Sequence, residues 1–169
     1  MVEHKDCSTT EKIAMDGLRV SGNLALMEVA DRSYAGERLS RMLGELAEAG
    51  VNMNLFIGGE TKEEIRFACC VAASDEAHIK ALMDPNPEFR TGVELSPAVD
   101  QLTLFPHRSE LKILGLGLTA LARARIPLRG FCSSLSAITF VTDHTDLDQA
   151  IAALEGCFGL AAETCGSPC

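Results

Sequence analysis

The chain has 169 residues, of which 47% are hydrophobic, 23% charged and 5% aromatic, with no Trp and one Tyr. This length accommodates one ordinary domain or two small ones and excludes a large multidomain enzyme. The net charge of −9 gives no electrostatic reason to bind nucleic acid or an anionic membrane. The polar N-terminus, the lack of a long apolar run and an odd number of cysteines, seven, predict a cytoplasmic protein with reduced thiols.

The first half of the chain predicts a strand, a helix, two strands and a second helix. Leu24 to Val29 is strand-like, and apolar residues then recur at helical spacing from Leu39 to Ala47, where Gly50 ends the helix. Ile65 to Val71 predicts a strand, and Ser74-Asp75 is suited to cap the short helix that follows.

Between them, the segment from Val51 to Ile57 alternates in polarity. This alternation predicts a strand with Val51, Met53, Leu55 and Ile57 on one face and Asn52, Asn54 and Phe56 on the other.

The second half repeats this order after the segment Asp84 to Pro87, where proline ends the preceding helix. Thr145 to Asp148 resembles a capping box that opens the last helix, whose apolar face reaches Phe158. The predicted elements are a strand over 102–105, a helix over 111–122, strands over 126–132 and 137–141, a helix from 147, and a loose tail over 161–169.

An internal repeat relates the two halves at a spacing of about 75 residues. Residues 46–56 align without gaps on residues 121–131, with identities at Leu46/Leu121, Ala47/Ala122, Ala49/Ala124 and Phe56/Phe131. A strand-helix-strand-strand-helix unit closed by a further short strand is the ferredoxin-like arrangement, an α+β fold whose helices cover one face of an antiparallel sheet. We expect Phe56 and Phe131 on the uncovered faces, where they would form a dimer interface in a homodimer.

Several motifs give the tandem its resemblance. Val29-Ala30-Asp31-Arg32 precedes the first helix, and that helix ends in Leu46-Ala47-Glu48-Ala49-Gly50-Val51-Asn52. Phe131-Cys132-Ser133-Ser134 and the run from Ala150 to Phe158 stand in order in the second repeat. This combination resembles the paired ACT regulatory domains at the C-terminal end of aspartokinases.

The resemblance implies two ACT units in tandem, over 13–84 and 99–160, with an N-terminal tail over 1–12, a linker and connecting strand over 85–98 and a C-terminal tail over 161–169. It also implies a noncatalytic protein, because nothing like the family's nucleotide-binding kinase half is present. The expected function is to bind a small-molecule effector, an amino acid, at an interface between ACT units and to act on a partner. The alternatives are a regulatory subunit of an aspartokinase-like kinase or other metabolic enzyme chain, and a dimerisation module with a degenerate pocket.

The resemblance places the effector at the N-terminus of the first helix, where backbone N–H groups favour a carboxylate. Asp31 is suited to accept the ammonium, and Gly36 allows close approach. Alternatively, Asp31 and Ser33 are ordinary cap or turn residues, and the asparagines simply face water. The expected ligand-binding residues are Asp31, Arg32, Ser33, Ala35, Gly36, Asn52, Asn54, Arg129, Ser133 and Ser134.

Departures from the family pattern leave open whether the site is retuned or lost. Ser33-Tyr34 stands where the family has Pro-Gly, and Lys112 and Pro127 replace residues that admit or contact the ligand. Arg129 is new and is suited to hold a carboxylate or phosphate, or is a solvated strand residue.

Other motifs carry little chemistry. Gly115-Leu116-Gly117 begins a G-x-G-x-x-A pattern that lies within a helix, so we expect close packing there rather than a nucleotide cofactor. The four histidines are scattered, and Cys165 and Cys169 alone do not make a metal site. We therefore expect no cofactor, no metal and no catalytic residue.

Overall fold

The computed structural model describes residues 12–31, 36–60, 62, 64–106 and 110–160, and its contacts divide the chain into two compact units. We call Gly22–Val99 the central unit, and Met1–Ser21 together with Asp100–Cys169 the terminal unit. Residues 13–21 thus lie with the second half of the chain in space. The predicted domain boundaries divide the chain into repeats along the sequence, whereas these two units are defined by contacts in space. The boundaries of the repeats therefore stay a prediction.

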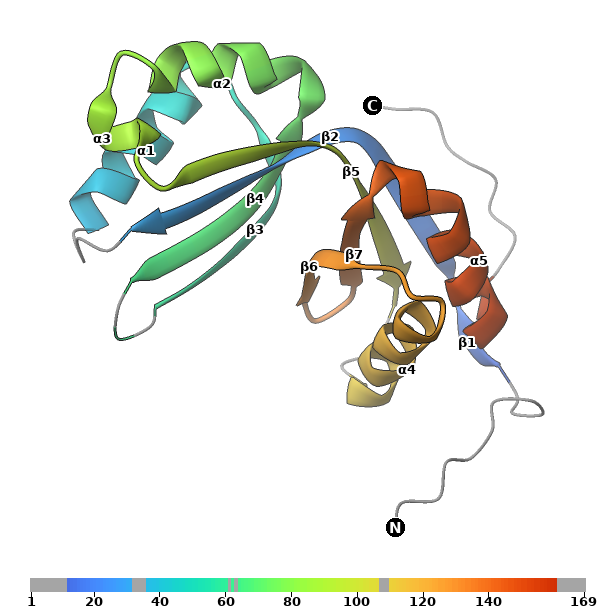
Figure 1. The fold of residues 1–169 in the computed structure, drawn as a ribbon. Coiled ribbons are helices and arrows are strands. Elements are labelled where there is room, and N and C mark those ends of the chain that lie inside the picture. The colour runs from blue at the N-terminus through green and yellow to red at the C-terminus, as the bar shows by residue number, and fades with distance from the viewer. Residues whose placement is uncertain (1–11, 32–35, 61, 63, 107–109, 161–169) are drawn as a thin grey trace. The chain divides into compact units, whose positions relative to one another are not determined.

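The central unit contains three helices and strands of an antiparallel sheet (Figure 1). Its elements are the greater part of β2 (Gly17–Asp31), α1 (Gly36–Glu48), β3 (Met53–Glu60), β4 (Ile65–Ala72), α2 (Glu76–Met83), α3 (Pro87–Arg90) and the first part of β5 (Val93–Phe105). Met42 and Leu46 of α1 and Ile79 and Met83 of α2 are buried against the strands, so both helices cover the same face of the sheet. We call this the helix-covered face.

The terminal unit builds the same arrangement from both parts of the chain. Its elements are β1 (Ile13–Met15), the start of β2, the end of β5, α4 (Leu111–Arg123), β6 (Leu128–Ser133), β7 (Ile138–Asp143), α5 (Leu147–Cys157) and β8 (Phe158–Leu160). β1 pairs with β8 in parallel, with Ile13 opposite Phe158. The segment Ile13–Met15 therefore completes this unit, an arrangement that the resemblance suggests and that the sequence alone left open.

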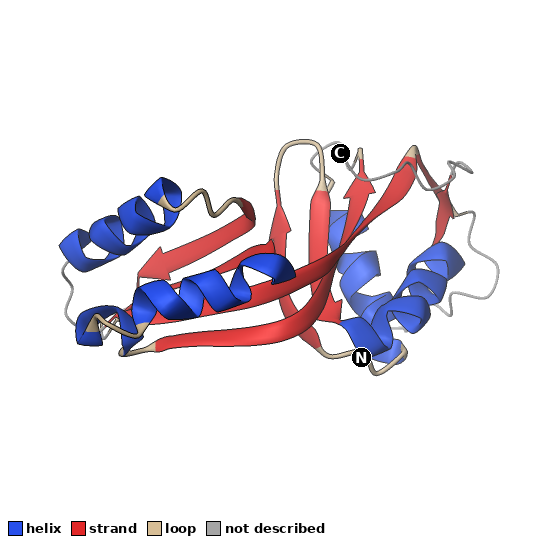
Figure 2. Cartoon of the chain, turned by 90° about the horizontal axis from the view of Figure 1, so that it is seen from above, coloured by secondary structure: helices blue, strands red, loops and turns tan. Residues whose placement is uncertain are grey.

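The larger sheet has the strand order β3-β4-β2-β5-β7-β6, and the strands appear in red in Figure 2. The long strands β2 and β5 each supply residues to both units. The predicted α+β fold, with two ferredoxin-like units, is confirmed. Within the described residues no helix is long and apolar enough to cross a membrane.

Both units repeat two local irregularities at the predicted spacing. The register between outer strand and neighbour shifts between Met53 and Leu55 in the central unit, and between Leu128 and Gly130 in the terminal unit. Two residues after the first helix of each unit, the backbone has a positive φ, at Gly50 (76°) and at Arg125 (59°). The repeat seen in the sequence therefore extends to backbone detail.

The register shift overturns the predicted faces of the strand over 51–57. A bulge places two residues opposite one, so residues beyond it change face. Met53 opposes the core residue Val71, whereas Leu55 opposes Cys70 on the other face and Phe56 opposes Cys69. Phe56 thus lies on the helix-covered face.

Phe131 is placed in the same way. It opposes Phe140, which is fully buried in the core beneath α4 and α5. The expectation that both phenylalanines lie on an uncovered face is wrong. Both are nevertheless half-exposed, at 47% and 45%, because they stand on the outer strands.

The predicted side-chain caps do not form. A short 3₁₀ turn precedes α2 and α5, so the residues before these helices, Asp75 and Asp146, already have helical backbone angles. A side chain in that conformation does not fold back to the helix N-terminus, and neither residue makes a side-chain capping hydrogen bond. The capping box predicted over Thr145 to Asp148 is therefore wrong. Phe158, predicted on the last helix, begins β8 instead.

Candidate functional site

Asp31 is the buried polar residue of the predicted site. It is the last residue of β2, opposes Ile65 of β4 and is 4% exposed. Gly36 begins α1 shortly afterwards, so the carboxylate lies close along the chain to a helix N-terminus. Arg32, Ser33 and Ala35 lie outside the described residues.

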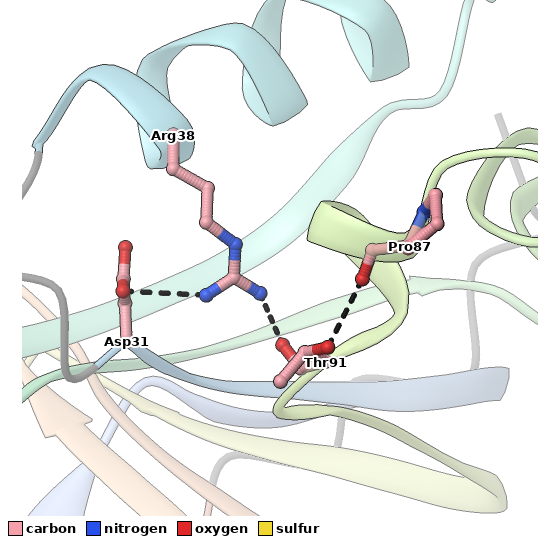
Figure 3. A network of polar contacts seen from close by, with 4 residues as sticks. All are labelled: Asp31, Arg38, Pro87 and Thr91. Atoms are coloured by element: carbon pink, nitrogen blue, oxygen red, sulfur yellow. Dashed lines mark hydrogen bonds and ion pairs between the residues drawn. The ribbon is translucent and has the colours of Figure 1, made fainter.

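Arg38, in the first turn of α1, is the cation that pairs with Asp31. Its Nη1 lies 3.3 Å from Asp31 Oδ1, and the two side chains are 15% and 5% exposed. Its Nη2 donates to the backbone carbonyl of Thr91, and Thr91 Oγ1 in turn donates to the carbonyl of Pro87 at 3.0 Å. Figure 3 shows the guanidinium between Asp31 and Thr91, so one side chain links the end of β2 to the segment after α3.

The space beside this ion pair is small. A recess of about 10 Å³ is lined by Asp31 and Arg38 and by the apolar side chains of Val29, Leu39, Met42, Ile65 and Phe67. That volume holds about one water molecule. The carboxylate expected to accept an effector's ammonium therefore already has a cationic partner from its own chain.

The two asparagines lie at the other end of the central unit. Asp31 is in register with Ile65, whereas Met53 is in register with Val71, six residues further along β4. At about 3.3 Å per residue this is roughly 20 Å. Asn52 and Asn54 are exposed, and Asn52 Nδ2 donates to the carbonyl of Gly50 at 3.4 Å. They are not brought to Asp31 within one unit, and their role in ligand binding stays a prediction.

The predicted residues of the second repeat form local contacts. Arg129 Nε lies 3.6 Å from Asp143 Oδ1, with both side chains partly exposed. Ser134 Oγ accepts from the amide of Ala137 at 3.1 Å, which closes the turn after β6, and Ser133 precedes it at the strand end. These contacts fit a strand surface and a turn, and a ligand-binding role for the three residues stays a prediction.

A wide groove occupies one end of the central unit. It has a volume of about 720 Å³ and lies over all four strands. Its lining residues include Gly58, Gly59, Ala30 and Ala68, with the charged residues Glu28, Glu60, Arg66 and Glu94 around them. Its size is in the range of small-molecule sites.

Cys69 of β4 is not a reactive thiol. Burial, with Cys70 alongside, raises the pKa of Cys69 to about 12, so this thiol stays protonated at neutral pH. Within the described part of the chain, no group of three or more His, Cys, Asp and Glu side chains is placed to hold a metal ion.

Sequence reasoning found Asp31 but missed its partners. Arg38 stands in the first turn of a helix, where the dipole disfavours a cation, and that misplaced charge was the available signal. Thr91 contributes a backbone carbonyl, for which the sequence carries no signal. The contact between the buried Asp100 and the exposed His144 in the terminal unit was missed as well; His144 Nδ1 lies 2.7 Å from Asp100 Oδ2.

Comparison with known proteins identifies the fold. No family model and no curated protein sequence matches the chain. Among solved structures, it is similar to the ligand-free regulatory subunit of aspartate kinase from Thermus thermophilus, with a TM-score of 0.75, 16% identity and coverage of 86% of this chain and 99% of that one. The regulatory subunit from Thermus flavus gives a TM-score of 0.76 at 15% identity, with coverage of 86% and 99%.

A longer enzyme matches over part of its length. The chain is similar to aspartate kinase from Clostridium acetobutylicum with a TM-score of 0.70 and 14% identity, covering 90% of this chain and 37% of the enzyme. The separate regulatory subunits are matched over almost their whole length, so the chain has the fold of an aspartate kinase regulatory subunit.

Proposed function

We propose that this chain is a noncatalytic regulatory protein that binds a small metabolite, an amino acid, at an ACT–ACT interface and transmits the binding to a partner protein. The observation that carries the proposal is the match to separate regulatory subunits over 99% of their length. The more specific form of the proposal is a regulatory subunit of an aspartokinase-like enzyme.

The end of β2 supplies the chemistry for an amino acid. Asp31 is a buried carboxylate that selects a cation, because a buried charge requires a partner. The N-terminus of α1, at Gly36, has orphan N–H groups that favour an anion. A carboxylate acceptor and amide donors, both required by a zwitterion, therefore belong to one end of the unit.

One observation favours the alternative of a dimerisation module with a degenerate pocket. Asp31 is already paired with Arg38, and the recess beside them holds about one water molecule. An amino acid then binds only if this end of the unit opens.

A thermal-shift screen separates the two functions. We expect one of the common amino acids, at about 10 mM, to raise the melting temperature by several degrees, because it binds only the native state. Asp31→Asn keeps the shape of the side chain but loses the charge, so it should abolish that rise. If no amino acid shifts the wild-type protein, the amino-acid function is wrong.

Self-association is tested on the outer strands. Phe56 and Phe131 are half-exposed on β3 and β6, and a charge there opposes contact with a second copy. We expect Phe56→Glu or Phe131→Glu to convert a homodimer into a monomer in sedimentation experiments. A dimer that survives both substitutions would remove these strands from the interface.

The partner is tested by co-purification. We expect the tagged chain to retain a kinase chain or another enzyme of amino-acid metabolism. Recovery of the chain alone, from cells that express such a kinase, would count against the regulatory-subunit form of the proposal.

A further inference from the structure

Arg38 occupies an unfavourable place for a cation unless it is paired. It lies in the first turn of α1, where the helix dipole is positive, and its side chain is only 15% exposed. Asp31, at 5% exposure, balances that charge. The two charges of this pair therefore neutralise each other, and removing the guanidinium makes room for another cation beside the Asp31 carboxylate.

The guanidinium has two separate acceptors. Nη1 faces Asp31 Oδ1 at 3.3 Å, and Nη2 donates to the carbonyl of Thr91 (Figure 3). Asp31 ends β2, whereas Thr91 lies between α3 and β5. The planar fork of arginine suits such a bridge, which a point charge does not reproduce.

The Thr91 segment is itself packed closely against β2. The amide of Ala30 donates to the carbonyl of Gly92 at 2.8 Å. Gly92 has φ of +74°, and a Cβ there would lie 2.3 Å from the carbonyl oxygen of Ala30. The backbone of Gly92 lies directly against that of Ala30, so a shift of the neighbouring Thr91 would disturb the hydrogen bond of the Ala30 amide.

We propose that Arg38 is a displaceable internal occupant of the cation site at Asp31, so that an ammonium-bearing ligand entering this site releases the turn at Thr91. This rests on the proposed function, because the ligand is the amino acid. The ligand's ammonium takes the place of the guanidinium at Asp31, and Arg38 withdraws its donor from Thr91. Binding is thereby coupled to the segment that leads into β5.

Chemical rescue of Arg38→Ala tests the proposal. We expect ethylguanidine, at about 20 mM, to raise the melting temperature of this variant by at least 2 °C, because it refills the site. Ethylammonium should give a similar rise. Hydrogen exchange at the Ala30 amide should be at least tenfold faster in the variant, and only ethylguanidine should slow it again.

Three controls sharpen the result. The double variant Asp31→Asn/Arg38→Ala should respond to neither cation, and tetramethylammonium, which has no N–H donor, should be inactive on both variants. Arg38→Lys keeps a charge beside Asp31 without the fork, so its melting temperature should stay near wild type while Ala30 exchanges faster. This variant carries the test if Arg38→Ala does not fold.

The outcomes separate the two proposals. Three results would overturn the role of Arg38. Ethylguanidine and ethylammonium would slow hydrogen exchange at Ala30 equally, or neither cation would raise the melting temperature of Arg38→Ala. The third is a wild-type rate of Ala30 exchange in Arg38→Lys. If the rescue succeeds but no amino acid shifts the wild-type protein or Arg38→Ala, the amino-acid function is wrong and the cation site at Asp31 stands. If an amino acid binds the wild-type protein and hydrogen exchange at Ala30 stays slow, the proposed release of the turn at Thr91 is wrong.

Discussion

Met42 in the central unit and Gly117 in the terminal unit stand 75 residues apart, at the same point of the first helix in each unit. The strand residues of the two cores follow the opposite order of size. Cys69, opposite Phe56, is small, whereas Phe140, opposite Phe131, is large. A large residue on the helix thus accompanies a small one on the strand in the central unit, and the terminal unit exchanges them. Equivalent positions of the two repeats therefore differ in residue size, while each unit combines one large and one small residue there.

A second difference between the units is polar. Ala25 of the central unit corresponds to Asp100, and Ala73, which starts the 3₁₀ turn before α2, corresponds to His144. Asp100 is 1% exposed and is held by His144, while its Oδ1 has no hydrogen-bond partner among the described residues. The terminal unit therefore depends on an ionisable pair where the central unit has two alanines.

Phe140→Ala is expected to have the largest effect on this comparison. The ring is fully buried, so its loss leaves a cavity and lowers the free energy of unfolding by about 4 kcal/mol. Cys69→Ala, at the corresponding position, should cost about 1 kcal/mol, because it removes much less volume. Urea unfolding measures both, and equal losses would contradict the exchange of sizes.

Gly117→Ala should lower the free energy of unfolding by about 2 kcal/mol, because the added Cβ lies 2.7 Å from Phe140 Cζ. Gly115→Ala is the matched control on the same helix. Gly115 is exposed with nothing within 4 Å of its Cβ, so alanine should stabilise by up to about 1 kcal/mol. Combining Gly117→Ala with Phe140→Leu should recover part of the loss, and a simple sum of the two losses would argue against a shared contact.

His144→Ala should cost about 1–2 kcal/mol, because it leaves Asp100 buried without its partner while His144 itself is two-thirds exposed. Asp100→Ala/His144→Ala reproduces the two alanines of the central unit. This double variant should be more stable than His144→Ala alone in the same urea titration. If it is less stable, the pair contributes more than a hydrogen-bond partner for the buried Asp100 carboxylate.

Arg125→Gly is expected to give the smallest effect and the opposite sign. The left-handed backbone at 59° costs an arginine about 1 kcal/mol, which glycine avoids, so the melting temperature should rise by a few degrees. Gly50→Arg imposes the residue of the terminal unit on the central one and should cost about as much. Calorimetry of both variants decides whether the two helix ends are equivalent.

Helix and strand order were predictable because apolar periodicity and the glycine stop report local structure directly. The faces of the outer strands were not, because a single bulge between Met53 and Leu55 reverses every later residue, and nothing in Asn54 announces it. The predicted caps of α2 and α5 were wrong for a related reason. Suitable capping residues precede both helices, but a 3₁₀ turn gives those residues helical backbone angles.

Of the candidate site, the sequence predicted only the hydrogen-bond acceptor, Asp31. Asp31 follows an apolar strand and precedes a helix, a pattern that marks it in the sequence. Its partner Arg38 and the carbonyl of Thr91 come together only through the packing of α3 and β5 against α1 and β2. The groove on the sheet was also beyond sequence reasoning, because small residues on three strands, β2, β3 and β4, produce it jointly.

The pairing of β1 with β8 sets an order for synthesis. Ile13 opposes Phe158, 145 residues later, whereas all residues of the central unit lie within Gly22–Val99. At about 5–20 residues per second, β1 waits roughly 7–30 s for its partner to be translated. The central unit can close on the ribosome during that time. Until then β1 lacks β8, its partner in the two-stranded sheet, so its backbone groups are open to wrong pairing.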